Sequence, residues 1–157
     1  MQNSKIKKKI ITLIGPTACN KTSNAVHLIK KFPISIIGVD SVQIYKRFNI
    51  GSAKPPKEIL KKYKHHLVDS TDPENIFSVK DFYDQAYRIV MQAHSNNRIP
   101  LLVGGTMMYF NALFNGINDI PEGNEAIREE LQQELDNKGV HKLFNLSLIH
   151  ISEPTRP

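Results

Sequence analysis

The stretch KIITLIGPTACNKT (residues 9–22) decides the fold of this chain. Residues 10–14 are a short apolar run of the kind that forms a fully buried parallel strand. Gly15-Pro16 is a strong turn signal, and a helix is expected to begin at Lys21-Thr22. A strand, a tight loop and a helix that opens on Lys-Thr are the layout of a phosphate-binding P-loop.

The chemistry of this loop suits an anion. Its residues are Gly15, Pro16, Thr17, Ala18, Cys19, Asn20, Lys21 and Thr22. Backbone N–H groups can point into such a loop, the helix dipole favours an anion there, and Lys21 adds a positive charge. The Thr22 hydroxyl can ligate a Mg²⁺ ion that bridges the phosphate oxygens.

The loop departs from the usual pattern at one position. The pattern has glycine directly before the lysine, whereas this chain has Asn20. Asparagine tolerates the left-handed backbone conformation better than most residues, so the loop can still form. A tight strand-to-helix turn that binds nothing is the alternative interpretation.

Length and composition set the broad class. The 157 residues suffice for one domain, or for most of the first domain of a larger protein. Hydrophobic residues make up 40%, mean hydropathy is −0.33, and no apolar run approaches the roughly 20 residues of a membrane span. The single cysteine excludes an internal disulfide and favours the cytoplasm. A net charge of +6 suits a polyanion such as RNA, although a basic enzyme of small anions would look the same.

Two more strands are expected to end in polar groups. The apolar segment ISIIGV (residues 34–39) leads into Asp40, for which a helix N-cap is the alternative role. Residues 99–103 lead into Gly104-Gly105-Thr106. Open α/β sheets bind ligands at the carboxyl edge of their strands. In a right-handed parallel sheet the loop, Asp40 and Thr106 therefore converge on one crevice.

Helices are expected between these strands, which makes the fold an α/β parallel sheet with flanking helices. They cover residues 22–31, 57–64, a segment from the N-cap Ser78 to Asn96, and 107–114. Residues 65–69 are expected to be extended. Adjacent side chains on a strand point to opposite faces, so His65 and His66 are not expected to bind one metal ion together.

Six blocks in order resemble the tRNA dimethylallyltransferase family, also called the tRNA isopentenylpyrophosphate transferase family. They read GPTA-x-x-KT, DSVQIY, IGSAKP, HHLVD, FSVKDF and LLVGGTMMYF, and the similarity covers about residues 8–146. The resemblance implies a P-loop NTPase-like core in residues 1–120 and the start of a helical tRNA-binding insertion in residues 121–146. It also implies transfer of a dimethylallyl group from dimethylallyl diphosphate to N6 of adenosine 37, with release of diphosphate, in tRNAs that read codons beginning with U.

The resemblance also implies roles for individual residues. Residues 15–22 would bind the diphosphate, and Thr22 would hold Mg²⁺. Asp40 would act as the general base toward N6 of a flipped-out adenine, and Thr106 would hydrogen-bond the bridging oxygen of the leaving group. The residues implied to contact tRNA are Asp40, Ser41, Val42, Gln43, Thr106 and Arg128. The expected partners are the tRNA anticodon stem-loop and dimethylallyl diphosphate, with no membrane partner, and the expected state is a cytoplasmic monomer.

Length is the second departure from the family. Family members are considerably longer, so we expect this chain to be an N-terminal portion with an incomplete core. Missing strands would leave an exposed sheet edge and exposed apolar surface. Residues 147–157 (SLIHISEPTRP) do not continue the family pattern. We expect this tail to be poorly ordered, or an artefact of translated adaptor DNA.

Two other interpretations remain open. One is a nucleotide or small-molecule kinase that binds ATP at the same loop and Mg²⁺ at Asp40, although no arginine-rich lid is visible. An isopentenyltransferase that acts on a free adenylate would be a closer relative of the first interpretation. The other is a catalytically inactive fragment of the transferase that binds diphosphate or RNA weakly.

Overall fold

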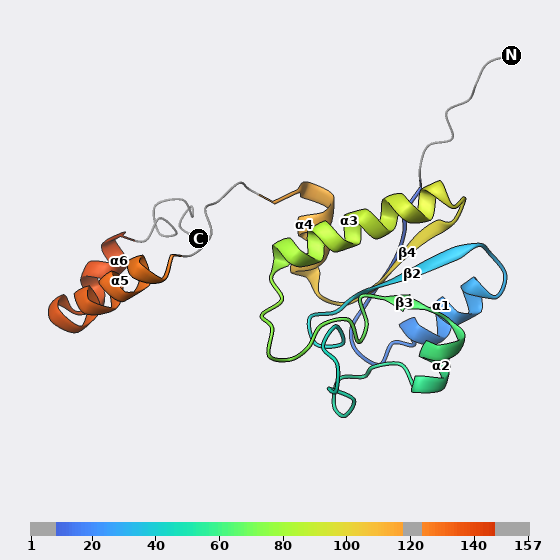
Figure 1. Cartoon of the computed structure of the whole chain (residues 1–157), viewed down its shortest axis with the longest axis horizontal. Helices are drawn as coiled ribbons and strands as arrows, with labels where there is room; N and C mark the ends of the chain where they lie inside the picture. Colours follow the sequence, from blue (N-terminus) through green and yellow to red (C-terminus); the bar gives the residue numbers. More distant parts are fainter. Residues whose placement is uncertain (1–8, 118–123, 147–157) are drawn as a thin grey trace, which may run out of the picture. The chain divides into compact units, whose positions relative to one another are not determined.

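The computed structural model describes residues 9–117 and 124–146 (Figure 1). The chain divides into two compact units, Met1–Ile117 and Asn118–Pro157, and each is described by itself. The expectation for the tail, residues 147–157, lies outside the described residues.

The first unit is built on one sheet of four parallel strands, in the order β1-β4-β2-β3. The strands are β1 (Ile11–Ile14), β2 (Ile34–Val39), β3 (His65–His66) and β4 (Ile99–Gly104). β4 pairs with β1 from Ile11↔Leu101 and with β2 from Ile34↔Ile99. This arrangement confirms the expected α/β fold with a parallel sheet.

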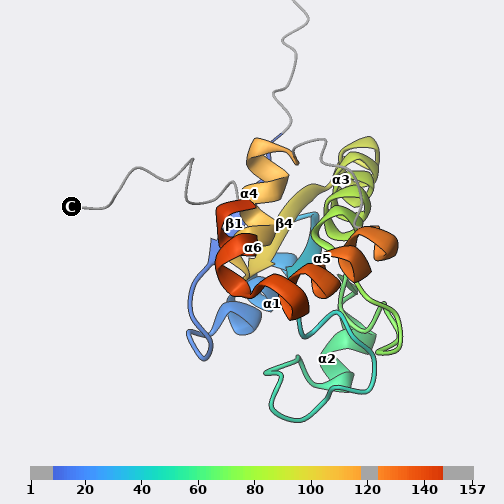
Figure 2. The same ribbon diagram turned by 90° about the vertical axis from the view of Figure 1, so that its left-hand side faces the viewer.

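Helices cover both faces of the sheet, with α3 and α4 on one side and α1 and α2 on the other (Figures 1 and 2). They are α1 (Lys21–Ile29), α2 (Lys57–Lys62), α3 (Val79–Ser95) and α4 (Met107–Asn115). Side chains alternate along β2, so Ile34 and Ile36 pack beside α1, whereas Ile37 and Val39 join the core with α3 and α4. This alternation places one hydrophobic core on each face.

α3 begins where the sequence predicts. Ser78 accepts a hydrogen bond from the Asp81 amide at 3.1 Å, and the Ser78 amide donates to Asp81 Oδ2 at 2.9 Å. This reciprocal capping box satisfies two backbone donors that the first turn of a helix leaves free. The Phe82 ring stacks on Tyr109 with centroids 4.2 Å apart, and this contact joins α3 to α4.

The expectation that the first strand is fully buried is wrong. β1 lies at the edge of the sheet, and Ile11 and Ile14 are 41% and 44% exposed. The reason is that only β4 pairs with β1 within residues 9–117 and 124–146. The finding agrees with the expectation of an exposed sheet edge with apolar surface.

The segment after α2, residues 65–69, also differs from prediction. Only His65 and His66 form a strand in the segment that was expected to be extended through residue 69. Leu67 and Asp69 have φ angles of 59° and 51°, so the chain turns there instead.

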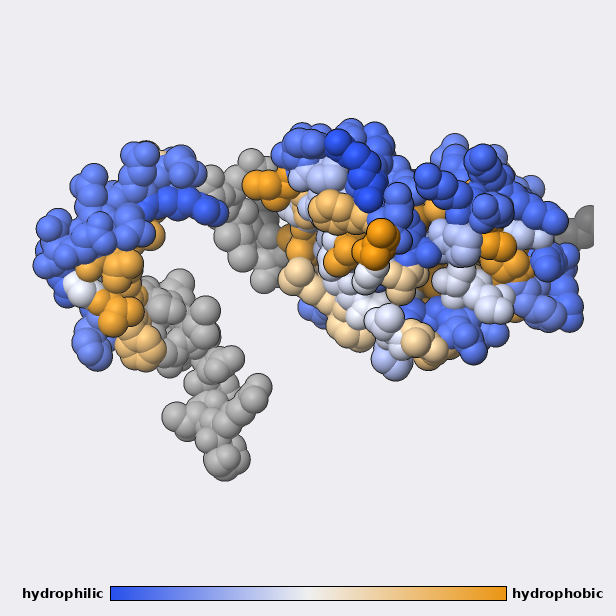
Figure 3. Space-filling model, turned by 90° about the horizontal axis from the view of Figure 1, so that it is seen from below, coloured by the Kyte–Doolittle hydropathy of each residue, from blue (hydrophilic) through white to orange (hydrophobic). Residues whose placement is uncertain are grey.

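The second unit is a pair of helices, α5 (Glu125–Lys138) and α6 (Val140–Leu146), joined at Gly139 with a φ of 77°. Glu134 accepts hydrogen bonds from Lys138 Nζ at 3.0 Å and Lys142 Nζ at 2.8 Å. The apolar side chains of the second unit gather on one side of the helix pair (Figure 3). The exposed ones are Ile127, Leu131, Val140 and Phe144. In neither described stretch does a helix combine the length and apolar character needed to cross a membrane.

Candidate functional site

The loop between β1 and α1 is held in an unusual backbone conformation. Asn20, the residue before α1, has φ 58° and ψ 24°, which confirms that asparagine adopts the left-handed conformation here. Ala18 has φ 65° and shares this conformation, which costs a residue with a Cβ roughly 1–2 kcal/mol. The strain at Ala18 was not foreseen, because nothing in its residue type indicates it.

Lys21 folds back over this loop. Its Nζ donates to the carbonyl oxygen of Gly15 at 2.7 Å and to that of Pro16, and it lies 3.6 Å from Cys19 Sγ. The ammonium is therefore held at the loop by neutral carbonyl groups. Phosphate oxygens carry more negative charge than these carbonyls and would be stronger acceptors for the same donor.

Glycines let the ends of three strands approach one another. A Cβ at Gly104 would lie 1.9 Å from the Val39 carbonyl oxygen, and one at Gly105 would lie 3.1 Å from the Gly15 oxygen. Any side chain at Gly104 would therefore force β2 and β4 apart. The Gly-Gly pair brings the end of β4 against the end of β2 and the loop after β1.

Asp40 follows β2 and uses one of its carboxylate oxygens for the backbone. Asp40 Oδ1 accepts from the amides of Val42 at 2.9 Å and Gln43 at 3.1 Å. These bonds cap a turn and not a helix, so the helix N-cap considered as the alternative for Asp40 is not formed. They orient the carboxylate through Oδ1. Thr106 Oγ1 accepts from the Ser41 amide at 3.1 Å, so its hydroxyl proton can be donated elsewhere.

A cavity of about 560 Å³ collects most of the predicted residues at the carboxyl edge of the sheet. Of the predicted residues, Thr17, Ala18, Cys19, Asn20, Lys21, Thr22, Asp40 and Gln43 line it. Gly15, Pro16, Ser41, Val42 and Thr106 are not among the lining residues, although they hydrogen-bond to residues of this region. Arg128 lies on α5, in the second unit, so it is described apart from the cavity.

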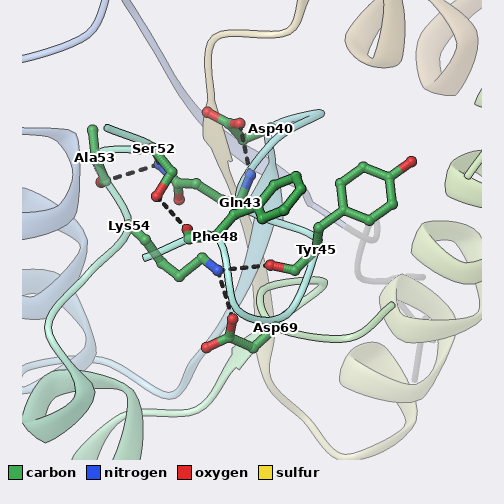
Figure 4. Close-up of polar contacts among 8 residues, drawn as sticks. All are labelled: Asp40, Gln43, Tyr45, Phe48, Ser52, Ala53, Lys54 and Asp69. Carbon is green, nitrogen blue, oxygen red and sulfur yellow. Dashed lines mark hydrogen bonds and ion pairs between the residues drawn. The ribbon is translucent and has the colours of Figure 1, made fainter. Parts of the chain in front are cut away.

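The sequence did not identify residues 52–53 as part of the cavity lining. Ser52 and Ala53 line the cavity, and their carbonyl oxygens each accept a hydrogen bond of 3.1 Å from Gln43 Nε2 (Figure 4). Lys54 follows them and donates to Asp69 Oδ1 at 2.6 Å. The blocks IGSAKP and HHLVD contain Lys54 and Asp69, but sequence spacing gives no sign that the two side chains meet.

The donor set of the cavity fits a magnesium ion. The Thr22 hydroxyl and the Asp40 carboxylate are hard oxygen donors that line the same space. Mg²⁺ is usually held by one or two protein oxygens together with substrate phosphates and water. Within the described residues there is no cluster of three or more His, Cys, Asp or Glu suited to a metal.

The paired histidines have another environment. His65 Nδ1 hydrogen-bonds to the Tyr63 carbonyl oxygen at 2.6 Å, and burial lowers the pKa values of His65 and His66 below the ordinary value. Both therefore favour the neutral form at neutral pH.

A parallel α/β sheet whose strands end at a P-loop-like turn and a polar cavity defines the class: an α/β protein with a P-loop NTPase-like fold. The particular family follows from comparison with known proteins. Residues 43–150 match the family model described as IPP transferase, and the chain belongs to this family.

Known relatives agree with this assignment. The tRNA dimethylallyltransferase of Dichelobacter nodosus is 44% identical over 135 residues, which are 86% of this chain and 42% of that protein. The crystal structure of the full-length tRNA isopentenylpyrophosphate transferase of Bacillus halodurans is 37% identical with a TM-score of 0.68, covering 93% of this chain and 48% of that one. A eukaryotic dimethylallyltransferase described as acting on tRNA is 26% identical with a TM-score of 0.69, over 85% of this chain and 33% of its own. The chain thus spans less than half the length of these relatives.

Proposed function

We propose that this chain carries the donor- and adenosine-binding part of a tRNA dimethylallyltransferase. The reaction moves the dimethylallyl group of dimethylallyl diphosphate to N6 of adenosine 37, in tRNAs that read codons beginning with U, and releases diphosphate. The observation that carries the proposal is that the cationic loop residue Lys21 and the carboxylate residue Asp40 line the same cavity. The Lys21 ammonium would stabilise the negative charge of the departing diphosphate. The Asp40 carboxylate would accept a proton from the weakly nucleophilic amine.

The loop would stabilise the leaving diphosphate. Backbone N–H groups of Gly15 and residues 17–22, the start of α1 and Lys21 would supply positive charge at one place. Mg²⁺ bound by Thr22 would neutralise further charge on the phosphate oxygens. Because Lys21 is held by neutral carbonyl groups of Gly15 and Pro16, it can transfer its donors to a phosphate without breaking an ion pair.

Asp40 after β2 would accept the proton of the adenine amine, and Thr106 after β4 would donate a hydrogen bond to the leaving group. Asp40 Oδ1 is held by two backbone amides, which leaves Oδ2 to accept a proton from N6. Thr106 Oγ1 already accepts from the Ser41 amide, which directs its own proton away from that nitrogen. This proton is available for the bridging oxygen of the diphosphate, which would keep donor and acceptor in line.

The tRNA would contact both units. Asp40, Ser41, Val42, Gln43 and Thr106 would contact the tRNA at the ends of β2 and β4, and Arg128 on α5 would contact the anticodon stem-loop. The net charge of +6 supports a polyanionic partner. We further propose that the protein acts as a monomer in the cytoplasm.

A second proposal follows from the exposed edge of β1. An incomplete sheet would leave the substrates without part of their surroundings, so this chain alone would bind them but transfer the prenyl group slowly or not at all. No comparable observation favours an ATP-dependent kinase.

Transfer of label from radiolabelled dimethylallyl diphosphate to an anticodon stem-loop with three adenosines at positions 36–38, in the presence of Mg²⁺, tests the proposal. We expect label in the RNA that is lost in Asp40→Asn and kept in Asp84→Asn, an equal change at an exposed aspartate on α3. Binding of both substrates without transfer would support the second proposal. Binding of neither substrate would contradict both.

A further inference from the structure

Lys54 is a buried cation that the proposed chemistry does not use. Its side chain is 3% exposed, and its Nζ donates to Asp69 Oδ1 at 2.6 Å and to the Tyr45 carbonyl oxygen at 2.7 Å (Figure 4). Asp69 comes from the turn after β3, and Tyr45 from the turn after β2. The Lys54 side chain therefore joins two parts of the β2–α2 connection to the turn after β3.

The contacts of Lys54 also position the two residues before it, Ser52 and Ala53, which line the cavity. Ser52 and Ala53 offer their carbonyl oxygens to Gln43 Nε2, and Ser52 Oγ donates to the Phe48 carbonyl oxygen at 2.7 Å. Carbonyl groups only accept hydrogen bonds, so they select the amide nitrogen of Gln43 and not its oxygen. The position of residues 52–53 thus decides how the Gln43 amide is oriented in the cavity.

We propose that Lys54 is a positioning residue, which holds the 52–53 wall so that Gln43 presents its carboxamide oxygen to an N–H donor on the bound substrate. The inference rests on the proposed function for the identity of that substrate. The positioning itself rests on the contacts of Lys54, Gln43 and Asp69 alone.

Burial of the lysine makes this pair different from the Lys46–Asp72 pair of the same region. Lys54 is 3% exposed and Asp69 is 36% exposed, so loss of the Asp69 charge leaves a buried ammonium uncompensated, whereas Lys54→Met removes both hydrogen bonds of the ammonium. The Lys46–Asp72 pair lies in the same turn region with a distance of 2.9 Å, but its side chains are 46% and 45% exposed. Exposed pairs of this kind contribute little, so Lys46 provides a matched control.

The test uses the full chain with Lys54→Met, Asp69→Asn and the control Lys46→Met. NMR would follow the two side-chain amide protons of Gln43, which are both hydrogen-bonded in the wild type, together with hydrogen exchange of the Ser70 and Thr71 amides, which donate to Ile44. In Lys54→Met we expect exchange in this region to accelerate at least about tenfold and the Gln43 protons to lose their protection. Lys46→Met should keep both signatures, and the amides of α3 should be unchanged in every variant.

Binding of the anticodon stem-loop RNA gives an independent readout, with affinity expected to fall about tenfold in Lys54→Met and to hold in Lys46→Met. Wild-type Gln43 signals in Lys54→Met would overturn the inference. If Lys54→Met unfolds throughout, Asp69→Asn decides, because it keeps the shape of the side chain: wild-type Gln43 signals there would also overturn it. Failure of the wild type to bind RNA would count against the proposed function, whereas the Gln43 signals would still test the positioning.

Discussion

The amide nitrogen of Ser41 donates a hydrogen bond of 3.1 Å to Thr106 Oγ1, although the two residues are 65 positions apart. The contact joins the carboxyl ends of β2 and β4, which carry the proposed base and the proposed proton donor. Because the hydroxyl oxygen accepts from the backbone, its proton points away from the Ser41 amide and is available to another acceptor.

This relationship gives the first prediction. Thr106→Val keeps the shape of the side chain but removes the proton and leaves the Ser41 amide unpaired. We expect prenyl transfer to fall by about two orders of magnitude or more, the usual size of a general-acid contribution. Single-turnover transfer with Thr106→Ser, which keeps the hydroxyl, should remain near the wild-type rate. Equal transfer rates for Thr106→Val and Thr106→Ser would show that the Thr106 hydroxyl takes no part in the reaction.

Gly104→Ala tests the close approach of the strands. The new Cβ would lie 1.9 Å from the Val39 carbonyl oxygen, and this backbone atom cannot move without separating β2 from β4. We expect the free energy of unfolding to fall by about 3 kcal/mol, at the upper end for overpacking. Gly51→Ala is the comparison, because its Cβ meets nothing within 4 Å and only its φ of 76° is unfavourable, at about 1 kcal/mol. Urea unfolding would measure both, and a smaller loss for Gly104→Ala than for Gly51→Ala would contradict the argument.

Ala18→Gly tests the backbone strain in the loop between β1 and α1. Glycine adopts the φ of 65° without a Cβ clash, so we expect the free energy of unfolding to rise by about 0.5–1 kcal/mol. Ala93→Gly in the buried face of α3 is the control, and there the same change should destabilise by about 1 kcal/mol. Both changes would be followed by urea unfolding. Destabilisation by Ala18→Gly would show that the alanine conformation is not under strain.

Ser78→Ala tests the capping box and its dependence on pH. At neutral pH we expect α3, and with it the domain, to lose about 1 kcal/mol of stability. Hydrogen bonds from Ser78 lower the pKa of Asp81 below its ordinary value of 3.8. The carboxylate therefore stabilises the fold above pH 3.8, and this contribution is lost as the pH falls through the lower folded pKa. Thermal unfolding from pH 7 to pH 2 should show the difference between wild type and variant shrinking at the acid end. A difference that stays constant would exclude the ionised Asp81 as its source.

Local sequence patterns predicted most of the fold. Each of the three strands that end at the cavity or beside it is a short apolar run followed by a recognisable signal: Gly15-Pro16, Asp40 or Gly104-Gly105. The capping box at Ser78 and Asp81 predicted the start of α3 in the same way. These features depend on neighbours within a few residues, so the sequence by itself determined them.

Tertiary structure decided what depends on residues far apart in the chain. The exposure of β1 depends on which strands lie beside it, and the Lys54–Asp69 pair depends on how two loops turn. Neither can be read from spacing, because hydrogen-bonded and ionic partners are chosen by distance in space. The sequence thus determined which groups are available for phosphate and proton chemistry, and packing of the sheet ends decided which of them share one cavity and what holds its wall in place.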